Sequence, residues 1–253
     1  MKIATLYDIH GNLPALEAVL AEIENEQVDA IMVGGDAIAG PMPNDVLDRL
    51  QAIQTPVHFI VGNGESEVLR YLAGEPIGAL TPAGEKGAIV VGDLLTEENK
   101  AFLRGWSFSV KFKSPHLGDI LFCHATPHNN THVFTKQSDP SQIEAVFDGV
   151  MADLVVCGHT HMQFDLSVAG KRMVNSGSVG MPFGEPGAHW LLIDETVEFR
   201  KTEFDREAAA ETIRQSQSPE AEAFVAGQIF STPAEPDVMA VLTMLADKQT
   251  TVR

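Results

Sequence analysis

The chain opens with MKIATLYDIHGN (residues 1–12), in which an apolar run, Ile3–Tyr7, is followed at once by Asp8 and His10. The run has the length and apolarity of a buried strand, and an amphipathic helical pattern comes after it. Two further apolar runs of strand length alternate with helical segments, at Ala30–Val33 and Val57–Val61. This βαβαβ order predicts parallel strands that are joined by right-handed crossovers.

The arrangement at the start of the chain, an apolar strand that ends in a possible metal ligand, occurs five times. The donors that follow these strands are Asp8, His10, Asp36, Asn63, His124, His159 and His161. Since ligands of open α/β sheets bind beyond the carboxyl ends of the strands, we expect these side chains to meet on one rim. His159 and His161 flank Thr160, so an extended strand would point both to one side.

The chemistry of these donors predicts the kind of site. No cysteine is among them, which excludes a structural zinc cage. Carboxylates, an amide oxygen and imidazoles suit manganese, the ion we expect, and also iron, zinc or nickel. Seven donors are too many for one such ion, so the set predicts two divalent ions about 3.5–4 Å apart that share a carboxylate.

Composition limits the partners of the chain. Its 253 residues include 17 Lys and Arg against 35 Asp and Glu, a net charge of −18, and no basic cluster that could hold long DNA or RNA. No apolar run approaches the ~20 residues that span a bilayer, so we expect a cytoplasmic protein without a membrane partner. Two bound cations would make one region locally positive, and that region could receive a small phosphorylated substrate.

The rest of the chain predicts a second, largely antiparallel sheet with a helical tail. Two hairpins and further strands are indicated at Phe108–Phe112, Ile120–Cys123, Phe164–Val168, Lys171–Val174, Trp190–Ile193 and Val197–Phe199. From about Arg206 the composition predicts helices broken at Pro219, Pro233 and Pro236. We therefore expect a single domain over residues 1–253, with its motifs in about 1–205 and a helical tail in about 206–253. The sequence leaves a homo-oligomeric assembly open.

Two polar or glycine-rich segments, residues 73–87 and 127–140, fit no regular element. Long loops inside compact domains are often functional. We expect both segments to be surface loops that determine specificity.

The motifs together resemble the calcineurin-like metallophosphoesterases, and in particular the small bacterial and archaeal phosphodiesterase branch. The residues that carry the resemblance are Asp8-Ile9-His10-Gly11-Asn12, Gly35-Asp36, Gly62-Asn63, His124, Gly158-His159-Thr160-His161 and Asn175-Ser176-Gly177-Ser178-Val179-Gly180. The resemblance runs from Met1 to about Asp194 and implies two mixed β-sheets packed as a sandwich, with helices outside and a binuclear metal site at one edge. The helical tail resembles no family that we can name.

The resemblance also implies a role for each ligand. Asp8, His10 and His161 would hold one ion. Asn63, His124 and His159 would hold the other, and Asp36 would bridge the two ions. A hydroxide between the ions would then attack phosphorus, which makes the chain a metal-dependent phosphoric ester hydrolase with catalytic residues Asp36, Asn63 and His124.

One position departs from the family pattern. Many members carry a histidine after the asparagine of the third motif, where it assists the leaving group, and this chain has Gly64. Loss of general-acid help lowers rates by ~10²–10⁴-fold, which favours a phosphodiesterase acting on a small diester or a nucleotide. The alternatives are a phosphomonoesterase, a dinucleoside polyphosphate hydrolase, or a metal-binding interaction scaffold of the same fold. Gly64 and His128 are the candidates for contact with substrate, and Glu65 is either a substitute acid or a first-turn helix residue.

Overall fold

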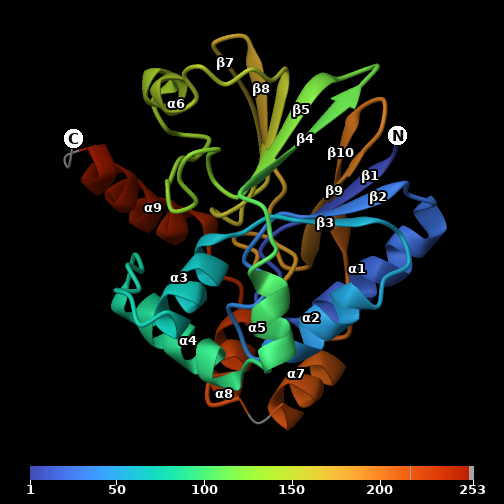
Figure 1. Cartoon of the computed structure of the whole chain (residues 1–253), viewed down its shortest axis with the longest axis vertical. Helices are drawn as coiled ribbons and strands as arrows, with labels where there is room; N and C mark the ends of the chain where they lie inside the picture. The colour runs from blue at the N-terminus through green and yellow to red at the C-terminus, as the bar shows by residue number, and fades with distance from the viewer. Residues whose placement is uncertain (217, 251–253) are drawn as a thin grey trace.

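The computed structural model describes residues 1–216 and 218–250 of the chain, and its strands there form two mixed five-stranded sheets (Figure 1). The first sheet, in spatial order, contains β10 (Val197–Thr202), β9 (Ala188–Ile193), β1 (Ile3–Leu6), β2 (Ala30–Val33) and β3 (Val57–Phe59). The second contains β4 (Ser109–Ser114), β5 (Gly118–Cys123), β6 (Leu154–Cys157), β8 (Lys171–Asn175) and β7 (Phe164–Val168). The predicted class, two mixed sheets flanked by helices, is confirmed.

The pairing of the strands agrees with the prediction in the first sheet and corrects it in the second. β1, β2 and β3 are parallel, β9 pairs antiparallel with β1, and β10 pairs antiparallel with β9. In the second sheet β5, β6 and β8 are parallel, and only the edge strands β4 and β7 are antiparallel. The expectation of a largely antiparallel second sheet is wrong, because the chain passes through edge strand β7 before it returns as β8 beside β6.

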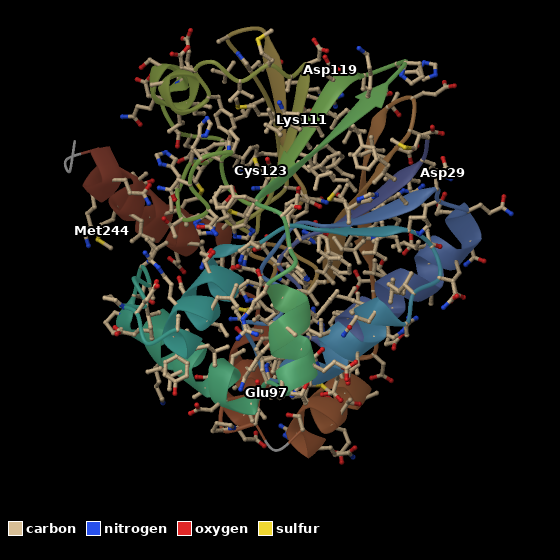
Figure 2. The ribbon with its side chains drawn as sticks, in the orientation of Figure 1. Asp29, Glu97, Lys111, Asp119, Cys123 and Met244 are labelled. Atoms are coloured by element: carbon tan, nitrogen blue, oxygen red, sulfur yellow. The ribbon has the colours of Figure 1, made fainter. Side chains whose placement is uncertain are left out.

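The core lies in layers on both faces of each sheet. In β5, Ile120 and Phe122 pack between the two sheets, whereas Leu121 and Cys123 pack on the outer face against α6 (Pro140–Val146). This alternation follows from the two-residue period of a strand. A strand buried on both faces is apolar at every position, which is why these strands stand out in the sequence. Figure 2 shows Cys123 in the interior, with Asp29 and Asp119 near the periphery.

Five helices cover the outer face of the first sheet. They are α1 (Leu13–Glu26), α2 (Pro43–Gln51), α3 (Asn63–Leu72), α4 (Pro82–Leu94) and α5 (Glu97–Leu103). Helix α4 corrects the prediction that residues 73–87 form a loop. The helix begins inside that segment because Thr81 accepts a hydrogen bond from the amide of Gly84 and Pro82 occupies the first turn, where proline is tolerated.

The C-terminal helices pack back onto the core. They are α7 (Arg206–Gln215), α8 (Ala221–Phe224), the π-helical turn Val225–Ile229 and α9 (Glu235–Thr250). The predicted break at Pro236 is wrong, because this proline lies in the first turn of α9. Buried residues of α9 pack against Val133 and Met162, which lie near the metal-ligand motifs. Among the described residues, no helix is both long and apolar enough to cross a membrane.

Candidate metal centre

The donors predicted from the sequence converge at the carboxyl ends of strands from both sheets. β1, β2 and β3 supply the first four donors along the chain, and β5 and β6 supply the last three. The expectation of a single rim is therefore wrong, since two sheet edges meet at the site. The structure brings together all the predicted donors, which are Asp8, His10, Asp36, Asn63, His124, His159 and His161.

Most of these donors lie in left-handed backbone conformations. The φ angles are 54° at Asp8, 51° at His10, 51° at Asp36, 67° at His159 and 57° at His161. Such conformations are unfavourable for residues with a side chain, by about 1–3 kcal/mol each, and they cluster at functional sites. His159 and His161 therefore lie in a tight turn after β6 and not in an extended strand as expected, so their side chains can serve different ions.

The first ligand group contains Asp8, His10 and His161. Nε2 of His161 lies 3.0 Å from Nε2 of His10 and 3.3 Å from Oδ1 of Asp8. All three side chains are buried. Their donor atoms therefore face one another within the space that a single cation would fill.

Backbone carbonyls fix the tautomers in this group. Nδ1 of His10 lies 2.9 Å from the carbonyl oxygen of Ala39, and Nδ1 of His161 lies 2.8 Å from that of Met181. A carbonyl only accepts, so each Nδ1 carries a proton and donates it. In the neutral rings both Nε2 atoms then present lone pairs to each other at 3.0 Å, an arrangement that is unfavourable unless a metal ion or a proton lies between them. Phe183 stacks on the ring of His161 at 4.8 Å and helps to hold it.

The second ligand group contains Asp36, His124 and His159, and Asn63 adjoins it. Nε2 of His124 lies 3.1 Å from Oδ1 of Asn63 and 3.6 Å from Oδ1 of Asp36. Nδ1 of His124 donates to the carbonyl of Gly34 at 3.0 Å, so in the neutral ring Nε2 carries the lone pair that could bind an ion.

Asp36 reaches both groups. Its Oδ1 faces His124 of the second group, and its Oδ2 lies 3.9 Å from Nε2 of His10 in the first. The amide of Gly64 donates to Oδ1 of Asp36 at 2.7 Å, which orients the carboxylate. Asp36 therefore has the position that a carboxylate shared by two ions would need.

Unsatisfied polar atoms support occupation by metal ions. Among the described residues, Oδ1 of Asp8 and Nε2 of His159 are buried and lack a hydrogen-bond partner. Buried polar atoms without partners are rare in proteins, and a bound ion is one of the explanations for those that occur. Carboxylate oxygens, imidazole nitrogens and an amide oxygen are ligands for divalent first-row metals. The residues present therefore fit two such ions.

The combined effects of burial and nearby charges lower the pKa values of two of the ligands, His159 and Asp8. Burial, with repulsion from His124, lowers the pKa of His159 to about 3, so this imidazole stays neutral and available as a ligand. Burial opposes ionisation of Asp8, yet the interactions with His161 outweigh it and lower the pKa of Asp8. Ligands must be neutral imidazoles and ionised carboxylates, and both shifts favour those forms.

Glu65 binds backbone amides next to the metal ligands and is not a substitute acid. Its Oε2 accepts from the amides of Asp36 and Gly62 at 2.8 Å each, and its Oε1 accepts from Ala37 at 2.8 Å and Ile38 at 3.3 Å. The side chain is fully buried, and burial together with repulsion from Asp36 raises its pKa to about 7. Glu65 therefore ties the turn that carries Asp36 to the start of α3.

The two candidate substrate contacts lie in different surroundings. His128 is exposed on the loop after His124. Gly64 is buried in the first turn of α3, and a Cβ placed there would lie 3.0 Å from Cβ of Ala39 and 3.1 Å from Oδ1 of Asp36. Its surroundings, not a positive φ, restrict this position to a small residue.

The sequence alone did not single out Glu67, whose Oε1 accepts from Nδ2 of Asn63 at 3.2 Å. This bond turns the amide so that Oδ1 of Asn63 faces the second ligand group. Burial and the charge of Asp36 raise the pKa of Glu67 to about 7. The spacing of four residues would have indicated the contact, but the extent of helix α3 was not predicted.

Comparison with known proteins agrees with this fold. The family model of the calcineurin-like phosphoesterase superfamily domain matches residues 1–196. The chain belongs to this superfamily, and it is a phosphoesterase by family. The resemblance inferred from the motifs is thus confirmed.

The relatives include proteins from archaea and bacteria. The uncharacterized protein MJ0912 of Methanocaldococcus jannaschii is 27% identical over 238 residues, which cover 86% of this chain and 94% of that protein. Phosphodiesterase YfcE of Escherichia coli K12 is 26% identical over 210 residues, covering 78% and 89%. The crystal structure of a metallophosphoesterase from Sphaerobacter thermophilus superposes with a TM-score of 0.68 at 21% identity, covering 90% of this chain and 98% of that one, which supports the fold alone.

Proposed function

We propose that the chain is a phosphodiesterase that hydrolyses a small phosphodiester with two divalent metal ions, manganese being the expected ion. The observation that supports the proposal most directly is the position of Asp36 between the two ligand groups, with 3.6 Å to His124 and 3.9 Å to His10. The phosphodiesterase among the relatives points to the same class.

The ions, when bound, would supply an activated water as nucleophile and neutralise charge on the phosphoryl oxygens. The protein's own part is to hold the donors in place. Backbone carbonyls orient His10, His124 and His161, and Glu65 fixes the turn of Asp36. Asn63, at the start of α3, is partly exposed, so a substrate can approach the second ligand group from that side.

The absence of an imidazole at position 64 favours diesters that have good leaving groups. The peptide N–H of Gly64 donates its hydrogen bond to Asp36, and glycine has no side chain that could protonate a leaving alkoxide. An aryl oxide needs little protonation, so aryl diesters should react faster than alkyl monoesters.

The test is hydrolysis of bis-p-nitrophenyl phosphate and of p-nitrophenyl phosphate with added Mn²⁺. The proposal expects a higher kcat/KM for the diester, loss of activity in Asp36→Asn, and unchanged activity in Asp148→Asn, which alters an exposed aspartate. Saturable metal binding without turnover, under manganese, iron, zinc or nickel, would favour an interaction scaffold. Faster turnover of the monoester would assign the protein to the phosphomonoesterases.

A further inference from the structure

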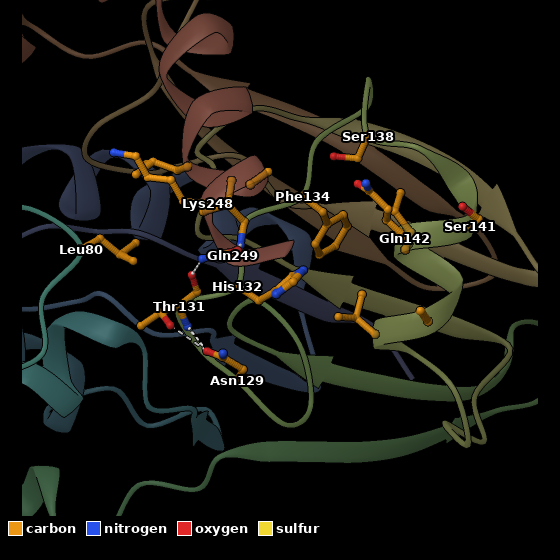
Figure 3. Close-up of a pocket in the computed structure, with 16 residues that line it drawn as sticks. Leu80, Asn129, Thr131, His132, Phe134, Ser138, Ser141, Gln142, Lys248 and Gln249 are labelled. Atoms are coloured by element: carbon orange, nitrogen blue, oxygen red, sulfur yellow. Dashed lines mark hydrogen bonds between the residues drawn. The ribbon is translucent and has the colours of Figure 1, made fainter. Parts of the chain in front are cut away.

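A cavity of about 620 Å³ lies between α6, the segment of residues 129–134 and the C-terminal helix α9 (Figure 3). Phe134, Ile143 and Leu245 supply apolar wall, and Leu80 contributes from the segment before α4. The volume is within the range of about 300–1,000 Å³ that small-molecule sites occupy. The elements that form it come from distant parts of the chain.

The side chain of Gln249 in helix α9 forms hydrogen bonds with the backbone of the cavity wall. Oε1 of Gln249 accepts from the amide of Val133 at 2.9 Å, and its Nε2 donates to the carbonyl of Thr131 at 2.8 Å. Apolar contacts of Met239 and Leu242 with Val133 continue this attachment along the helix. The cavity is therefore a built feature, closed on one side by the C-terminal helix.

The same segment connects the cavity to the metal centre. Asn129 lines the cavity. Its neighbour Asn130 donates to the carbonyl of Gly62 and to Oγ of Ser66, at 2.8 Å each. Gly62 directly precedes the ligand Asn63 in the chain. The wall of the cavity thus lies against the part of α3 that begins the metal site.

The chemistry of the lining differs from that of the chain as a whole. In the part of the chain that the structure describes, no aspartate or glutamate lines the cavity, although the chain carries a net charge of −18. Lys248 contributes a permanent positive charge to the lining. Among the described residues, the Gln142 side-chain amide forms no hydrogen bond, so it has both a donor and an acceptor available.

We propose that this cavity binds the nucleoside part of a phosphodiester substrate. A nucleobase is flat and uncharged and has donors and acceptors on its edge, which matches apolar walls with an amide and a lysine. Gln142 and Lys248 are exposed residues of the lining, so they can pair with polar groups on the edge of a base, which an acyl chain lacks. The substrate assignment rests on the proposed phosphodiesterase function, whereas nucleoside binding does not.

Two diesters that release the same leaving group test the proposal. Thymidine 5′-(p-nitrophenyl phosphate) and methyl p-nitrophenyl phosphate differ only in the alcohol that remains on phosphorus. We expect the wild type to prefer the nucleoside diester in kcat/KM by on the order of 10- to 100-fold, because binding energy away from the reacting atoms is used in the transition state.

Filling the cavity should remove that preference. Ala246→Trp, on the lining side of α9, should reduce kcat/KM for the nucleoside diester to the level of the methyl diester and leave the methyl diester unchanged. Val241→Trp lies on the same helix at a position that is 51% exposed and outside the cavity, and should behave as the wild type. Ala145→Trp repeats the test from an exposed position of α6 that lines the cavity, in case the first variant melts at a lower temperature.

Calorimetric titration with thymidine separates this proposal from the proposed function. If neither diester is hydrolysed, the phosphodiesterase function has failed, and binding of thymidine to wild type but not to Ala246→Trp or Ala145→Trp would still support the site. No preference between the diesters together with no thymidine binding would overturn the inference. A preference that survives in both tryptophan variants would overturn it as well.

Discussion

Substitution of Gly64 by alanine tests how closely α3 is packed against the metal ligands. Glycine inside a helix is usually less favourable than alanine by about 0.8–1 kcal/mol, so the change alone should be stabilising. Here the new Cβ would lie 3.0 Å from Cβ of Ala39 and 3.1 Å from Oδ1 of Asp36. Oδ1 already accepts from the Gly64 amide at 2.7 Å, so the carboxylate must shift by a few tenths of an ångström and strain that bond.

Gly87 offers a matched control. It lies in helix α4, and a Cβ there would meet only Oε2 of Glu220, at 3.9 Å. Gly87→Ala should therefore gain the full ~1 kcal/mol of helix propensity, which raises Tm by about 2–4 °C in a chain of this size. We expect Gly64→Ala to gain nothing or to melt lower than the wild type, because crowding of Asp36 opposes a propensity gain of similar size.

The two variants should also differ in metal binding. Calorimetric titration with Mn²⁺ should give weaker binding in Gly64→Ala, since Asp36 faces both ligand groups, and unchanged binding in Gly87→Ala. Thermal melting and metal titration of the three proteins complete the experiment. If Gly64→Ala gains as much stability as Gly87→Ala and binds Mn²⁺ like the wild type, the reasoning about the space beside Asp36 is refuted.

Three further predictions concern the carboxylates of the site. Glu65→Leu should destabilise the metal-free protein by several kcal/mol, since each buried N–H that loses its acceptor costs about 1–3 kcal/mol. The contribution of Glu65 to the free energy of unfolding is complete below the pKa that this residue has in the unfolded chain, and it declines as pH rises through about 7. In urea titrations, the difference in unfolding free energy between the wild type and Glu65→Leu should therefore be smaller at pH 8 than at pH 5. Glu67→Leu should lower the affinity for the second metal ion, whereas Glu67→Gln, which still accepts from Asn63, should retain it. Equal affinities of the two variants in metal titrations would contradict this role. Asp36→Asn should lower activity at saturating metal more than Asn63→Ala, and elemental analysis should find about two ions per wild-type chain; equal kcat losses would argue against a bridging Asp36.

The strands and the ligands could be predicted because both leave a local pattern. A strand buried on two faces is a continuous apolar run, and its carboxyl end is where the polar residue appears. Asp8 and His124 were identified in this way. The membership of the strands in two sheets has no local signal, because it depends on which strands pair far along the chain.

The errors have physical causes too. Residues 73–87 contain glycine and proline, which usually indicate a loop, yet the cap at Thr81 and packing against α3 allow a helix from Pro82. Proline in a first turn has no amide that the helix would need, so Pro236 begins α9 and does not break it. The contacts of Glu65 with the turn after β2 join residues 27 or more positions apart, and no single segment predicts them.

The site combines strained ligands with an unstrained scaffold, and the hydrogen bonds explain how the strain persists. Asp8 and His10 keep left-handed backbones because their amides donate to the carbonyls of Gly35 and Asp36, at 3.0 and 2.9 Å. Glycine would adopt these angles without strain but has no side chain that could bind a metal ion. Neighbouring turns thus hold one another in place, and a change in one turn is transmitted to ligands on both sheets. We therefore expect Glu65, which bonds only backbone amides, to alter metal binding although it is not itself a ligand.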